Sequence, residues 1–83
     1  MRKFELSQEQ IDFLKKEYAD NPLVQKVLAS ENSRRFEIDV DTKIAFMDYI
    51  EDESVYWIGN DYEATPKTRI LESIRDDIYY QTN

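Results

Sequence analysis

Carboxylates are the side chains of this sequence that could do most of its chemistry, and half of them lie in one segment. The sequence has 18 Asp and Glu residues against 11 Lys and Arg residues. Nine of the carboxylates lie between residues 37 and 63, namely Glu37, Asp39, Asp41, Asp48, Glu51, Asp52, Glu53, Asp61 and Glu63. Lys43 is the one base among them, so this acidic segment has a net charge of −8, against −7 for the whole chain. Carboxylates at this density could transfer protons, bind a divalent cation or attract a basic partner.

Metal binding and catalysis are not expected from the acidic segment. Asp39 and Asp41 are spaced like the first ligands of an EF-hand calcium loop, but Ile44 stands where that loop requires glycine. The sequence contains no cysteine and no histidine, which removes thiolate nucleophiles, Cys/His zinc sites and imidazole bases. A single glycine leaves no phosphate-binding glycine loop. We therefore expect no enzyme activity, no catalytic residue, no metal and no cofactor.

The remaining chemistry is the attraction of a basic partner protein. Aromatic residues stand between the acids, and Trp and Tyr provide large contact areas at many protein interfaces. An acidic surface also repels the phosphates of nucleic acids, so nucleic acid is not the expected partner. The residues predicted to form the contact surface are Glu51, Asp52, Glu53, Tyr56, Asp61 and Tyr62. We expect a small acidic module that regulates or inhibits a basic partner, a class that includes nucleic-acid-binding proteins. In the alternative, the acids only keep the surface solvated.

A DNA-binding dimer is a second hypothesis, and it depends on the basic residues of the N-terminal half. Two short helices on either side of Asn21 would have the order of a helix-turn-helix motif. Gln25 and Lys26 would then face DNA, and Arg34 and Arg35 would contact phosphate. A pI near 4.5 opposes this hypothesis, because binding to DNA depends largely on positive charge. A third hypothesis is an accessory protein with a purely structural role.

Two helices are predicted at the N-terminal end of the chain. Ser7 and Gln10 have the spacing of a capping box, in which each side chain accepts a hydrogen bond from the backbone of the other residue. The apolar residues that follow have helical spacing and predict a helix over residues 8–19. Asn21-Pro22 is a typical helix start, and the second helix is expected to end near Ser30.

A small β element is predicted after these helices. Residues 31–35 are polar and are expected to form a loop. Phe36, Ile38 and Val40 then alternate with acidic residues, a period of two that indicates a short half-buried strand. Residues 3–6 could supply a second strand beside it. A two-stranded ribbon needs helices packed on one face, and the chain provides them.

The stretch from Asp41 to Ile58 is compatible with more than one structure. The apolar residues at helical spacing are Ile44, Met47, Ile50, Val55 and Ile58. Residues 51–54 interrupt this pattern, and residues 55–58 are rich in strand formers. A hairpin could turn at Gly59-Asn60. We favour a helix from Thr42 to Glu51, with Asp41 or Thr42 as its cap, and leave residues 51–64 open between helix, loop and hairpin.

A last helix is expected from Thr65-Pro66 to about Tyr80, where a cap and a proline precede a stripe of apolar residues. Together these elements predict a mainly α fold, with α+β also possible. The expected architecture is a small single domain over residues 1–83, with three to four helices and a minor two- or three-stranded β element.

The location and the oligomeric state follow from composition alone. No stretch approaches the ~20 apolar residues of a membrane span, and no signal peptide is evident at the N-terminus. We therefore expect a cytoplasmic protein without membrane contact. A homo-oligomer is possible, because so small a domain buries only about 60% of its unfolded surface. Small size, excess acid and the lack of cofactor motifs are typical of accessory proteins of bacteria or their phages.

Overall fold

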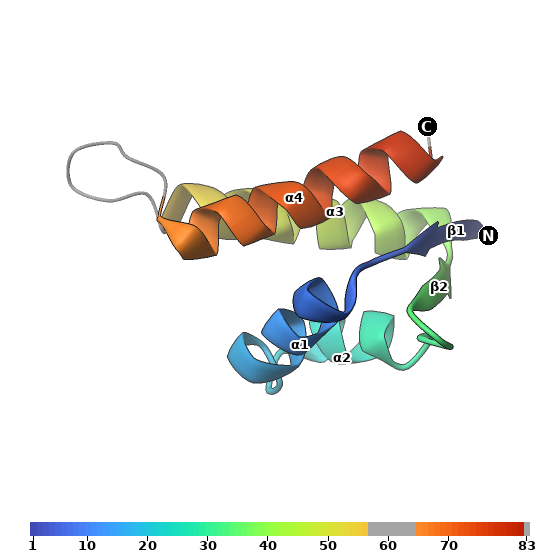
Figure 1. The fold of residues 1–83 in the computed structure, drawn as a ribbon. Coiled ribbons are helices and arrows are strands. Elements are labelled where there is room, and N and C mark those ends of the chain that lie inside the picture. Colours follow the sequence, from blue (N-terminus) through green and yellow to red (C-terminus); the bar gives the residue numbers. More distant parts are fainter. Residues whose placement is uncertain (57–64, 83) are drawn as a thin grey trace.

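The computed structural model describes residues 1–56 and 65–82. Its elements in chain order are β1 (Arg2–Glu5), α1 (Gln8–Glu17), α2 (Pro22–Leu28), β2 (Arg35–Ile38), α3 (Val40–Tyr56) and α4 (Pro66–Thr82). In Figure 1, α3 and α4 lie side by side, α1 and α2 form the lower part of the view, and the strands lie at one end. The prediction of a mainly α fold with a minor β element is confirmed. No helix in these two ranges is both long and apolar enough to cross a membrane.

The capping box at the start of α1 also ties this helix to α4. The backbone N–H of Gln10 donates to Ser7 Oγ at 3.2 Å, and the N–H of Ser7 donates to Gln10 Oε1 at 2.8 Å. The buried Gln10 amide then donates from Nε2 to Ser73 Oγ at 3.1 Å and to Asp77 Oδ2 at 2.8 Å. One side chain therefore completes the cap and holds two helices that are far apart in the sequence.

The two predicted strands pair antiparallel at the end of the helical layers. Phe4 lies opposite Phe36, and their rings stack with centroids 5.0 Å apart. Gln81, near the end of α4, binds the backbone of β1. The N–H of Glu5 donates to Gln81 Oε1 at 2.6 Å, and Gln81 Nε2 donates to the carbonyl of Glu5 at 2.7 Å. Both ends of the described chain are thus joined at the sheet.

The connection before β2 is tighter than the predicted loop. Asn32 and Arg35 form a β-bridge, and their backbone N–H groups each donate to the carbonyl of the other residue. Ser33 and Arg34 lie between them with φ of 54° and 68°. Positive φ at both central residues is typical of a type I′ turn, in which Asn and Gly are preferred. The strain of this turn is not evident from a polar sequence without glycine.

Helix α3 begins earlier and ends later than predicted. Val40 is its first residue and does not extend β2, because the Asp39 carboxylate accepts hydrogen bonds from the backbone N–H and the hydroxyl of Thr42. Asp39 is therefore the cap, and the prediction of Asp41 or Thr42 in that role is wrong. At the other end, Tyr56 is still helical. The hairpin predicted at Gly59-Asn60 lies outside the described residues.

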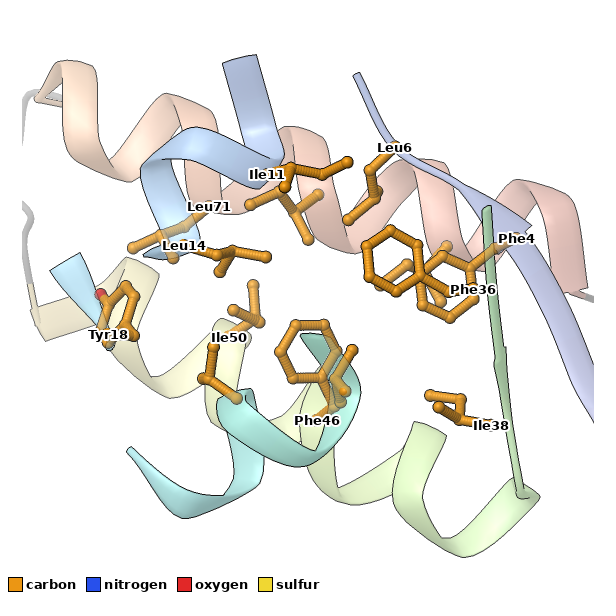
Figure 2. Close-up of a cluster of buried hydrophobic side chains, with 14 residues drawn as sticks. Phe4, Leu6, Ile11, Leu14, Tyr18, Phe36, Ile38, Phe46, Ile50 and Leu71 are labelled. Atoms are coloured by element: carbon orange, nitrogen blue, oxygen red, sulfur yellow. The ribbon is translucent and has the colours of Figure 1, made fainter. Parts of the chain in front are cut away.

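The core draws on both strands and on all four helices of the described chain. Figure 2 shows its buried apolar side chains, which are Phe4, Leu6, Ile11, Leu14, Tyr18, Val24, Val27, Phe36, Ile38, Phe46, Ile50, Leu71, Ile74 and Ile78. Leu71, Ile74 and Ile78 belong to α4, where the predicted narrow stripe is confirmed. Since α3 and α4 are antiparallel neighbours around this core, the position of each helix depends on the other.

Replacement of Gln10 by alanine tests the link between α1 and α4. The change removes the acceptor for Ser7 N–H and the two donor contacts to α4, and we expect a loss of about 2 kcal/mol in the free energy of unfolding. The thermal midpoint should fall by roughly 10 °C in a calorimetric scan. Gln8→Ala is the matched control, because Gln8 is exposed and binds only within α1. Equal losses from the two variants would contradict the link.

Candidate functional site

The rotation of α3 about its axis decides which of its residues are available to a partner. Phe46 and Ile50 lie one helical turn apart, are 0% exposed and point into the core (Figure 2). The predicted apolar stripe is therefore only partly correct. Ile44 is 52% exposed and Val55 is 63% exposed, because they lie on the side of α3 that faces away from the core. α3 thus carries apolar residues on two sides, and the core covers one of them.

The predicted contact residues do not all lie on one side of this helix. Glu51, Asp52 and Tyr56 are exposed on α3, and Tyr56 is 73% exposed. Asp61 and Tyr62 lie outside the described residues. Glu53 is half-buried and lines a hollow between α3 and the turn that joins α1 to α2. Neighbouring residues of a helix are rotated by about 100°, which is why Asp52 and Glu53 face different surroundings.

Glu53 belongs to the environment of Tyr49. The Tyr49 ring packs edge-on against Tyr18, with centroids 5.7 Å apart, and is half-buried. Burial raises the pKa of the Tyr49 phenol, and the negative charge of Glu53 raises it further. The phenol is therefore neutral at physiological pH. Tyr49 thus packs between α3 and the turn at Asn21.

Three carboxylates form a line along the exposed side of α3. Only one of them, Asp52, belongs to the predicted contact surface. Asp41, Asp48 and Asp52 are separated by about two turns and about one turn, so they share one side of the helix. We call these three residues the acidic stripe. At a rise of about 1.5 Å per residue, the stripe extends over about 16 Å. Its signal in the sequence was the spacing of the acids, which becomes informative once the rotation of α3 is known.

The acidic stripe has no cationic partner among the residues that the structure describes. Of the α3 carboxylates in this part of the chain, only Glu51 forms an ion pair, at 3.9 Å from Arg75 Nη1. Acids on other elements pair with lysine or arginine, as in Lys15–Glu31 at 3.9 Å, Arg34–Glu5 at 3.7 Å and Lys67–Glu17 at 3.4 Å. Among the described residues, negative charge that is not held in an ion pair therefore concentrates on the exposed side of α3.

The residues of the DNA-binding hypothesis are less available. Arg34 lies 3.7 Å from Glu5, and the Gln25 amide donates to the carbonyl of Ala19 at 2.6 Å. α2, the helix that would enter the groove, has only 7 residues. Within residues 1–56 and 65–82, no three or more side chains of His, Cys, Asp or Glu lie together in a group that could hold a metal ion. The exposed side of α3 is thus the better candidate for a functional surface.

Comparison with known proteins finds no matching family model, no matching curated protein and no matching solved structure. The chemistry of the exposed residues is therefore the basis on which a function can be inferred. Among these residues, the acidic stripe is the feature with the clearest chemical preference, because carboxylates without a cation attract positive charge.

The cap that begins α3, and so positions the acidic stripe, gives a prediction of pH dependence. The hydrogen bonds from Thr42 hold the pKa of the Asp39 carboxyl below its ordinary value. A carboxylate with a lowered pKa stabilises the fold above its unfolded pKa of about 3.9, and this contribution is lost as the pH falls through the folded pKa. We therefore expect the thermal midpoint of the wild type to fall between about pH 4 and pH 2 more steeply than that of Asp39→Asn.

The matched variant for this measurement is Thr42→Val. It keeps the shape of a buried side chain but removes the hydroxyl that donates to Asp39. Its midpoint should also depend less on pH than that of the wild type over this range. Identical slopes in the three proteins would show that Asp39 is not the group that titrates at the start of α3.

Proposed function

We propose that this protein is a small acidic interaction module that binds a basic surface of a partner protein through the exposed side of α3, and that it regulates or inhibits that partner. The observation that carries the proposal is the acidic stripe of Asp41, Asp48 and Asp52, which has no cationic partner in the described part of the chain. Of the predicted contact surface, Asp52 belongs to this stripe, and Glu51 and Tyr56 are exposed on either side of it on α3.

Electrostatic complementarity gives such a module speed and selectivity. Exposed charges act over about 8 to 10 Å at physiological salt, so the stripe accelerates the approach of a basic surface and repels an acidic one. Lysine and arginine cluster on proteins that bind nucleic acids, because these proteins neutralise phosphates. Nucleic-acid-binding proteins are thus one class of partner, and occupation of their basic surface by the stripe would inhibit them.

Charge reversal on α3 tests the proposal. The wild type and the variant Asp48→Lys/Asp52→Lys are used to capture proteins from a lysate of the native host at about 50 and about 300 mM salt. A partner of the stripe should be retained by the wild type at low salt, should weaken at high salt through screening, and should be reduced at least tenfold with the variant. The retained protein should be basic.

The matched control is Asp12→Lys/Asp20→Lys, which changes the net charge equally at exposed positions outside α3. This control should retain the partner at the level of the wild type. If both variants lose the partner equally, binding follows net charge and the stripe has no special role. If the wild type retains only DNA, the hypothesis of a DNA-binding dimer replaces the proposal, and Arg34 and Arg35 become the residues to test in a mobility-shift assay.

A further inference from the structure

An exposed apolar ridge lies beside the acidic stripe in the first half of α3. Val40, Ile44 and Met47 follow one another at spacings of about one turn. Val40 is 42% exposed and Ile44 is 52% exposed, while Met47 is half-buried. These three residues, the apolar ridge, are on the part of α3 next to β2 (Figure 1). A ridge of this spacing is the form in which one helix packs against another.

The apolar ridge lines a hollow of about 390 Å³. The cationic residues Arg2, Lys43 and Arg75 also line it, from β1, α3 and α4, together with the acids Asp48 and Glu51. The ion pair between Glu51 and Arg75, at 3.9 Å, lies at the far end of the ridge from Val40. The surface therefore has an apolar centre with the acidic stripe along one flank and cationic residues along the other. Isolated exposed apolar residues are common on proteins, but a continuous ridge in a hollow is typical of a binding site.

A second copy of this chain fits the surface poorly. If two α3 helices packed antiparallel along their ridges, the acidic stripes would lie close to each other, and Asp41 and Asp48 would be partly desolvated beside like charges. In a parallel pair each stripe would lie beside the cationic flank of the other copy, but the net charge of −7 on each chain would still oppose association. Because charge on the stripe is negative, an occupant of this surface needs lysine or arginine on the flank that faces the stripe.

We infer that the apolar ridge and the acidic stripe together bind an amphipathic helix of the partner, with its apolar side on Val40, Ile44 and Met47 and its lysine or arginine residues opposite the stripe. This inference rests on the proposed function and specifies the form of the partner. Since the stripe extends over about 16 Å, about three turns of a helix would cover it. The expected pattern in the partner is apolar residues at i, i+4 and i+7, flanked on one side by basic residues.

Two synthetic peptides of equal length and composition separate the inference from the proposed function. The first places leucine on one side of a basic helix, and the second is a scrambled peptide that keeps the charge but has no apolar side. Binding is measured by calorimetric titration at low salt, and NMR spectra locate the contact. The amphipathic peptide should bind at least tenfold more tightly than the scrambled peptide and should shift the signals of Ile44 and Met47.

Ile44→Gln is the variant that tests the ridge, because Ile44 is exposed and glutamine is tolerated in helices. This variant should bind the amphipathic peptide roughly tenfold more weakly than the wild type does, and should bind the scrambled peptide as the wild type does. Tyr80→Gln, a change at an exposed residue near the end of α4, is the control and should bind like the wild type. Circular dichroism checks that each variant is folded.

The other outcomes overturn the inference in distinguishable ways. If both peptides bind equally and both are lost with Asp48→Lys/Asp52→Lys, the proposed function stands and the amphipathic helix does not. If neither peptide binds, or if Ile44→Gln has no effect, the ridge is not the docking surface, and the lysate capture decides the proposed function by itself. If the wild type forms a dimer that Ile44→Gln abolishes, a second copy occupies the surface.

Discussion

Phe46 and Ile50 fix the rotation of α3, and most of the surface chemistry of this protein depends on that rotation. Both side chains are fully buried one turn apart, against a core that α4 completes with Leu71 and Ile74. A rotation of α3 by about half a turn would move them into water and bury the acidic stripe, at a cost of several kcal/mol. The acids therefore cannot exchange places with the core, and the exposed side of α3 is a fixed feature of the fold.

Helices with local start signals were predictable, whereas α3 was predicted only over residues 42–51 and without its cap. The capping box of Ser7 and the Asn21-Pro22 start are decided by residues a few positions apart, so the sequence alone reveals them. Asp39 was concealed, because the alternation of Phe36, Ile38 and Val40 resembles a strand that continues past it. The rotation of α3 was hidden as well, since its apolar residues lie on two sides and only packing against α4 distinguishes them.

In the candidate site, too, the composition could be predicted from the sequence and the geometry could not. The excess of acid in residues 37–63 is evident by counting, whereas the separation of Asp52 from Glu53 needs the helix. Asp41 and Asp48 become candidate contact residues only because they lie on the same side of α3 as Asp52. Gln10 could be recognised as part of a cap, but no local pattern reveals its contacts with Ser73 and Asp77, which are more than sixty positions away.

The hydrogen bonds between Gln81 and Glu5 also affect how the protein behaves at high concentration. A strand at the edge of a sheet exposes backbone N–H and C=O groups to which another chain can add, and this leads to aggregation. On the outer edge of β1, the Gln81 amide occupies both polar groups of Glu5, as a neighbouring strand would. The remaining outward position is Lys3, and an exposed lysine at an edge discourages strand addition. The end of α4 thus shields the β1 edge of the sheet from the addition of another strand.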